Sequence, residues 1–232
     1  MRFFALYPFL NTTMLLQVEP SEGLETISVL ELLLNGGYMM IPILLLFIGA
    51  IYIFAERLSL IKSSSGTPPD FKQQIRDRVL SGDINGAKMI CQQTGTPVAR
   101  MIQKGIERIG SPLKNIEVSI ENTGKIEIYR LEKNLSMLAT ISGAAPMIGF
   151  LGTVTGMIQA FIAIAQEEGA VSPKLLSGGI YEAMITTASG LFVGILAYLG
   201  YNYLVTRVQK LIHMMEYTSI DFVDLLQEPQ KK

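Results

Sequence analysis

Two threonines and one glutamate are candidates for chemistry because each lies within or beside a long uncharged segment. Thr153 lies within 33 consecutive uncharged residues, 134–166, and Thr187 lies within another such segment, 183–206, which Glu182 directly precedes. A threonine hydroxyl donates and accepts hydrogen bonds but does not ionise at accessible pH. The threonines could therefore position water or a carboxylate, whereas storage of a proton would need a carboxyl group.

Three uncharged segments predict the elements that carry these residues. Residues 32–55, 134–166 and 183–206 each exceed the roughly 20 residues that cross a bilayer. A soluble core helix of that length would still show a charged face. The sequence therefore predicts an all-α, polytopic membrane protein with three transmembrane helices.

The polar residues are predicted to lie well inside the bilayer. Ser172–Pro173 is a helix start, which begins the third helix about ten residues before Ala183. Thr153 and Thr187 then lie roughly 18 Å and 21 Å from the outer ends of their antiparallel helices, at similar depth. Glu182 would lie roughly 13 Å inside and be a functional-site candidate, or it is an interfacial anchor if the helix enters the bilayer only near Ala183. The sequence leaves both interpretations open.

Small residues form one stripe on each of the last two spans. The second span has Ala145, Gly149, Gly152 and Gly156, and the third has Ala183, Thr187, Gly190, Gly194 and Ala197. Helices in lipid associate through close backbone approach at such residues. The stripes predict that spans two and three pack tightly against each other and line a central pore, with the bulkier span one outside. Ordinary helix packing, without a channel, would produce the same glycine pattern.

Basic residues predict the orientation. The connection 56–136 holds 13 Lys and Arg, whereas the segment before the first span holds one basic residue, Arg2, and four glutamates. Because basic residues near span ends mark the cytoplasmic side, we expect a periplasmic N-terminus and a cytoplasmic C-terminus. The organisation is then a periplasmic segment with an amphipathic helix (1–37), span one (38–57), a cytoplasmic helical region (58–136), span two (137–166), a periplasmic loop (167–174), span three (175–205) and a cytoplasmic helix and tail (206–232).

The cytoplasmic region is predicted to be helical throughout. Short helices are expected at about 70–80, 83–92 and 97–109, the last with Thr96 as N-cap before Pro97. From Leu113 a single helix is predicted to continue to Ala165. The first residues, MRFFALYPFL, resemble the start of a signal peptide, but no cleavage site follows, so a segment at the membrane surface is favoured.

No catalytic set is recognisable. Cys91 is the single cysteine and is expected to be a free structural thiol, and His213 is the single histidine. The sequence has no phosphate-binding loop, nucleophile–base pair or paired metal ligands. We therefore expect no enzyme, no metal, no cofactor and no nucleic-acid partner.

Two longer motifs carry a family resemblance over essentially the whole chain. PMIGFLGTVTGMIQAFIAIA resembles the second span, and GGIYEAMITTASGLFVGILAYLGYN the third span, of the ExbB/TolQ/MotA proton-channel family. Within that family the chain is most similar to the ExbB branch, and TolQ is close.

The resemblance implies a pentamer around the single spans of an ExbD-like subunit whose membrane aspartate takes up the proton. Thr153, Thr187 and Glu182 match the family's polar pore positions. The implied function is a proton-channel motor subunit of the bacterial inner membrane, which energises TonB-dependent outer-membrane import through a TonB-like protein. A TolQ-like role in the Tol-Pal envelope system and a non-conducting scaffold for a partner helix remain as alternatives.

Overall fold

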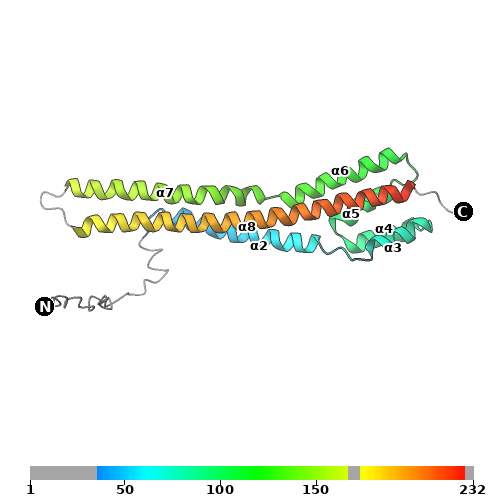
Figure 1. Cartoon of the computed structure of the whole chain (residues 1–232), viewed down its shortest axis with the longest axis horizontal. Coiled ribbons are helices and arrows are strands. Elements are labelled where there is room, and N and C mark those ends of the chain that lie inside the picture. Colours follow the sequence, from blue (N-terminus) through cyan, green and yellow to red (C-terminus); the bar gives the residue numbers. More distant parts are fainter. Residues whose placement is uncertain (1–35, 167–172, 228–232) are drawn as a thin grey trace, which may run out of the picture.

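The computed structural model describes residues 36–166 and 173–227, and this part of the chain forms helices and no strands. Two long helices, α7 (Leu135–Gln166) and α8 (Pro173–Gln227), run side by side, and α2 (Met40–Ser64) packs against both (Figure 1). The shorter helices gather around the C-terminal end of α8: α3 (Phe71–Leu80), α4 (Ile84–Thr94), α5 (Pro97–Ile106) and α6 (Leu113–Glu132). The predicted all-α class is confirmed.

Three stretches are long and apolar enough to cross a membrane by length and composition: Met40–Ser64, Leu113–Gln166 (which contains α7) and Ser177–Gln227. Their outward faces carry large apolar side chains, and on α2 Ile41, Leu45 and Tyr52 are 63%, 65% and 68% exposed. A soluble monomer rarely exposes an apolar surface of this extent, whereas lipid accepts it without cost. The exposure therefore agrees with three spans.

The single helix predicted from Leu113 to Ala165 is wrong at one point. Lys133 has extended backbone angles (φ −51°, ψ 137°) and Asn134 is left-handed (φ 64°), which separates α6 from α7. Asparagine enters this conformation more readily than other non-glycine residues. Leu131 and Leu135, on either side of the break, are both buried, so the change of direction lets each helix bury its own leucine. Figure 1 shows α6 turning away from the line of α7.

Most of the predicted helix starts are observed. Thr96 is the N-cap of α5, its Oγ1 accepts a hydrogen bond from the Ala99 amide at 3.4 Å, and Pro97 occupies the first turn. The third short helix ends at Ile106 and not at 109, and α8 begins at Pro173 as predicted. Helix α2 extends to Ser64, beyond the end predicted for span one.

Some predicted elements lie outside the described residues. These are nearly all of the N-terminal segment 1–37 with its amphipathic helix, most of the loop 167–174, and the end of the tail after 227. Within the described residues, α8 is continuous for 55 residues, so the third span and most of the predicted cytoplasmic helix are one element.

Candidate functional site

The two glycines Gly149 and Gly190 mark the closest approach between α7 and α8. A methyl group added at Gly190 would lie 2.5 Å from the Ala145 carbonyl oxygen and 2.9 Å from the Gly149 Cα. One added at Gly149 would lie 2.9 Å from the Thr186 carbonyl oxygen. These are backbone atoms that a side-chain rotation cannot move, so only glycine allows the observed helix spacing.

The same contact line continues in both directions. Its other glycines each face a side chain of the opposite helix: Gly152 faces Thr186, Gly156 faces Ala183 and Gly194 faces Pro146. We call the contact line formed by the six predicted packing residues the seam: Ala145, Gly149, Gly152, Gly156, Gly190 and Gly194. All six are buried in the structure.

The threonine hydroxyls lie beside the seam and donate to backbone carbonyls. Thr187 Oγ1 donates across the helix pair to the Gly149 carbonyl oxygen at 2.9 Å. Thr153, one turn along α7 from Gly149, donates within its own helix to the Phe150 carbonyl oxygen at 2.6 Å. With their protons engaged, both oxygens retain lone pairs that can accept a hydrogen bond from water or from a protonated carboxyl group.

Thr153 and Thr187 share one side of the seam. Helix α2 packs on the other side, against Val193 and Gly200 of α8 and Ile141 of α7. At 100° per residue, Val193 and Gly200 lie about 120° and 140° round α8 from Thr187. On α7, Ile141 lies about 120° round the helix from Thr153. We call the side that carries the two threonines, away from α2, the threonine flank; both residues are half-buried there.

Glu182 does not join the two threonines. It precedes Thr187 by five residues, so the two side chains point about 140° apart around α8. Its carboxylate lies against Gly37, which has a φ of 64° just before α2, so closely that a side chain at Gly37 would overlap it. The structure thus brings Thr153 and Thr187 onto one flank and places Glu182 on the flank of α2.

Two features of the site region were missed from the sequence. Thr186 is 2% exposed and packs against Gly152, whereas the stripe was assigned to its neighbour Thr187. Glu127 is 3% exposed and binds Arg100 at 2.6 Å and Arg130 at 2.7 Å. The available indication for Glu127 was its spacing of three residues from Arg130, which is common on solvated helices and therefore weak.

The Glu127 cluster joins the C-terminal half of α2 to α5 and α6. Arg57 of α2 is 4% exposed and donates from Nη1 to the Arg130 carbonyl oxygen at 3.2 Å. It also pairs with Glu56 at 2.7 Å. A buried carboxylate needs such partners to offset its lost hydration, so this cluster fixes α5, α6 and α2 relative to one another.

The remaining candidates offer no reactive group. Cys91 is buried, and burial raises the pKa of its thiol to about 12. His213 lies on the surface of α8, 3.5 Å from Glu216. No group of three or more His, Cys, Asp or Glu that could hold a metal occurs among the residues that the structure describes.

Comparison with known proteins places the seam within a matched region. Residues 93–217 match the model of the MotA/TolQ/ExbB proton channel family, which is more than half of the chain and covers α5 to most of α8.

Individual relatives extend over different lengths. An ExbB homolog of Methanothermobacter thermautotrophicus, named for biopolymer transport, is 30% identical over 193 residues, 82% of this chain and 67% of its own. The biopolymer transport protein ExbB of Neisseria gonorrhoeae is 30% identical over 147 residues, 57% of this chain and 65% of its own. The Tol-Pal system protein TolQ of Haemophilus influenzae is 41% identical over 85 residues, 37% of each chain.

Proposed function

Because the chain belongs to the MotA/TolQ/ExbB proton channel family and is ExbB-like, we propose that it is a proton-channel motor subunit that energises TonB-dependent outer-membrane import. Its three apolar helices and its family make it an inner-membrane protein and a transport component, not a member of a known enzyme family. One observation carries the proposed mechanism. It is the Thr187 hydroxyl bound to the Gly149 carbonyl, with Thr153 one turn away on the same flank.

The proton-storing group in this proposal comes from a partner. Helix α7 contains no acid, base or histidine, and on α8 the nearest acid, Glu182, lies on the flank of α2. An ExbD-like single-span subunit would bring a membrane aspartate to the threonine flank. The lone pairs of Thr153 and Thr187 would accept a hydrogen bond from that carboxyl when it is protonated and release it when it ionises.

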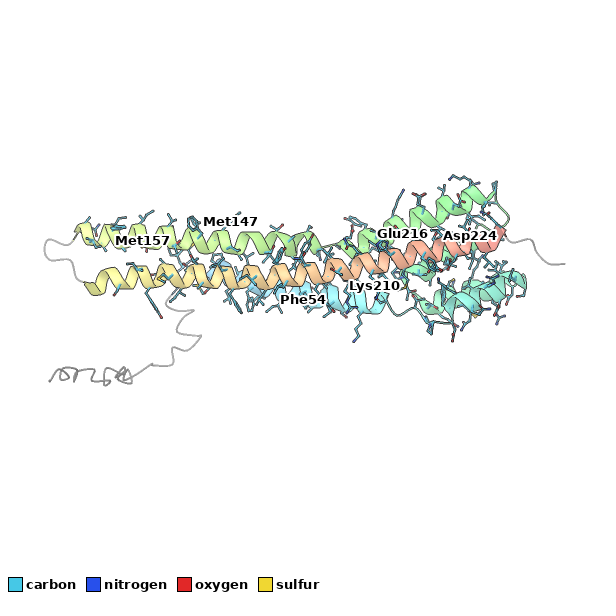
Figure 2. The ribbon with its side chains drawn as sticks, viewed as in Figure 1. Phe54, Met147, Met157, Lys210, Glu216 and Asp224 are labelled. Atoms are coloured by element: carbon cyan, nitrogen blue, oxygen red, sulfur yellow. The ribbon has the colours of Figure 1, made fainter. Side chains whose placement is uncertain are left out.

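The proposed assembly is a pentamer with the threonine flanks turned inward and α2 outside. Large apolar side chains lie exposed toward that side of the helix pair: Phe150 and Met184 are 66% and 65% exposed. Met147, labelled in Figure 2, projects from α7 away from α8 and is 74% exposed. In a pentamer such residues would contact neighbouring copies and the partner's span, and a TonB-like protein would relay the motion outward.

The energy source is sufficient for this mechanism. One charge that crosses 100 mV of membrane potential releases about 2.3 kcal/mol. That is more than the strength of one or two hydrogen bonds between membrane helices, about 0.6 kcal/mol each. Proton transfer could therefore break and remake contacts along the threonine flank during a cycle.

Orientation is part of the proposal. The distribution of basic residues supports a periplasmic N-terminus and a cytoplasmic helical region at residues 58–136. Met89 is 59% exposed on α4, so a cysteine introduced there in a Cys91→Ser background should react with an impermeant maleimide only after lysis. Labelling of intact spheroplasts, which still have a sealed inner membrane, would contradict this orientation.

Proton flux in liposomes tests the channel. We expect the chain alone to form oligomers and conduct poorly, and co-reconstitution with the ExbD-like subunit to confer flux. Thr153→Ala or Thr187→Ala should lower flux by about threefold or more, the equivalent of one lost hydrogen bond of about 0.6 kcal/mol, without loss of assembly. Thr155→Ala is the matched control, because Thr155 also binds carbonyls within α7 but lies about 160° round the helix from Thr153, off the threonine flank. Equal flux with and without the partner would refute the shared-pore mechanism, and no flux under any condition would favour the scaffold.

A TolQ-like role in the Tol-Pal envelope system is the second candidate. The specific support for it is the 41% identity to a TolQ over 85 residues. Complementation of strains that lack either system distinguishes them. We expect restored uptake of iron chelates, whereas restored envelope integrity alone would assign the chain to the Tol-Pal system.

A further inference from the structure

An apolar groove of about 340 Å³ runs between α2 and α8, on the side opposite the threonine flank. Its lining contains no ionisable side chain, and its main contributors are Phe47, Ile51, Phe54, Ala55, Leu196 and Gly200. Phe54, labelled in Figure 2, lies on α2 beside α8. Because no polar side chain lines the groove, water would find few hydrogen bonds there, and the space suits a hydrocarbon.

The groove opens outward toward the surrounding bilayer. Ile51 on one wall is 53% exposed and Leu196 on the other is 43% exposed. Gly200 forms part of the floor, and a methyl group there would lie 3.0 Å from the Phe54 ring. An acyl chain could thus enter sideways from the lipid phase without any movement of a helix.

Two cations lie beyond the inner end of the groove. Helices α2 and α8 run in the same direction (Figure 1), and Lys62 and Arg207 each follow a groove residue, Ala55 and Gly200, by seven residues. Seven residues are two turns, so each cation lies on the groove side of its helix and about 10 Å farther inward. Both are exposed.

Tyr203 connects the groove to Arg207. The Arg207 guanidinium donates to the Tyr203 hydroxyl at 3.1 Å and lies 5.3 Å from its ring, while the Tyr203 ring lies 6.4 Å from that of Phe54. Among the described residues, neither Lys62 nor Arg207 pairs with a carboxylate, and the nearby Glu56 is paired with Arg57. Positive charge is therefore available at this end of the groove.

The dimensions match one leaflet. From Phe47 to Lys62 is 15 residues of helix, about 22 Å, and half of a bilayer with its headgroup region is about 20–22 Å thick. We propose that this groove binds one anionic glycerophospholipid, with an acyl chain along Phe54 and Gly200 and its phosphate between Lys62 and Arg207. The proposal rests on the bilayer placement described above but not on proton conduction.

Tryptophan fluorescence tests this directly, because the chain contains no tryptophan. A single reporter is introduced at Ile51 in the groove, and a control reporter at Leu45, which is 65% exposed on α2 but does not line the groove. The full-length protein is reconstituted in vesicles that contain brominated phosphatidylglycerol or brominated phosphatidylcholine at equal mole fraction. Leu196→Trp serves as a second groove reporter if Ile51→Trp does not fold.

We expect the groove reporter to be quenched preferentially by the brominated anionic lipid and the Leu45 reporter to be quenched equally by both lipids. About 1 kcal/mol per basic residue near the surface corresponds to about a fivefold preference for each cation. Lys62→Gln with Arg207→Gln should abolish the preference. The matched double variant Lys114→Gln with Lys125→Gln removes two exposed charges on α6 and should retain it.

Three results would overturn the proposal. Equal quenching by both lipids at the groove reporter would show that no anionic lipid is selected. Retention of the preference in the Lys62/Arg207 double variant would exclude the headgroup site. A groove reporter that neither lipid quenches, beside a Leu45 reporter that both quench, would show that another protein surface, such as a second copy of this chain, covers the groove. None of these results depends on proton flux, so they are independent of the test of channel function.

Discussion

Replacement of Gly190 by alanine adds one methyl group at the closest point of the seam. The new Cβ would lie 2.5 Å from the Ala145 carbonyl oxygen, and ordinary van der Waals contact begins at 3.4 Å. Relief of that overlap moves α7 and α8 apart by about 0.9 Å at this level, because both sides are backbone. The same movement would stretch the bond from Thr187 to Gly149 from 2.9 Å to about 3.8 Å, beyond hydrogen-bonding range.

The magnitude follows from a comparison with Gly143→Ala. Gly143 is also on α7, but a methyl group there meets nothing within 4 Å. The gain in helix propensity, about 1 kcal/mol, is common to both variants and cancels. Overpacking costs about 1–3 kcal/mol and the lost interhelical hydrogen bond about 0.6 kcal/mol. Gly190→Ala should thus be less stable than Gly143→Ala by about 2–4 kcal/mol.

Unfolding in mixed micelles measures this difference. Circular dichroism follows the loss of helix as the denaturing detergent increases, and the two variants are compared with the parent at the same protein concentration. Gly190→Leu and Gly152→Leu should go further and break the oligomer or close its cavity, whereas Leu44→Ala on α2 should be tolerated, as native mass measurement would show. Equal unfolding midpoints for Gly190→Ala and Gly143→Ala would refute the backbone-to-backbone contact at the seam.

The remaining predictions concern α4, α6 and the break between α6 and α7. Cys91 should stay unmodified by a thiol reagent at pH 8 and react once the protein is unfolded, because its pKa of about 12 keeps the buried thiol protonated; rapid reaction of the native protein would contradict its burial. Glu127→Ala should cost about 1.5–3 kcal/mol of unfolding free energy because it removes the buried carboxylate that accepts hydrogen bonds from Arg100 and Arg130, which are themselves 41% and 62% exposed, whereas Glu121→Ala, an exposed pair on the same helix, should cost at most about 1 kcal/mol. Asn134→Gly should be neutral or slightly stabilising and Asn134→Val destabilising by about 1–2 kcal/mol, since the residue is left-handed; the reverse order in thermal unfolding would exclude the observed break.

The spans and the seam were predictable because each depends on a local sequence pattern whose structural meaning does not change with tertiary packing. An uncharged run longer than a bilayer crossing has few alternatives to a membrane helix. Glycines at spacings of three and four lie on one face of a helix, where they leave a strip without side chains. On α7 that strip is buried in the structure. The start of α8 at Pro173 was equally local, since proline favours the first turn of a helix.

The break at Lys133–Asn134 could not be predicted in the same way. Neither residue is a strong helix breaker, and the leucines on both sides keep a helical spacing. The break depends on α6 following α5 and the end of α8, whereas α7 follows the seam. This is a tertiary constraint that overrides local propensity.

Side-chain direction around α8 was the other missing information. Thr186 and Thr187 are adjacent, and small-residue spacing alone does not tell which of the two turns into the seam and which bonds across it. Glu182 was grouped with the threonines because it matches a polar pore position of the family, while its depth also allowed an interfacial anchor, and neither the match nor the depth carries information on the angle around the helix. The position of α2 decides that angle, and nothing in the third span encodes it.

The unbroken length of α8 has a mechanical consequence. From Thr187 to Gln227 the helix continues for 40 residues, about 60 Å, without an interruption. A helix of this kind acts as a stiff lever: a tilt of about 5° at the level of Thr187 would carry its far end through about 5 Å. The neighbouring helix α7 is separated from α6 by the break at Asn134, so α6 need not follow a tilt of α7. A displacement that begins at Thr153 and Thr187 would therefore be transmitted along α8 to its C-terminal end, whereas between α7 and α6 it would be absorbed at the break at Asn134.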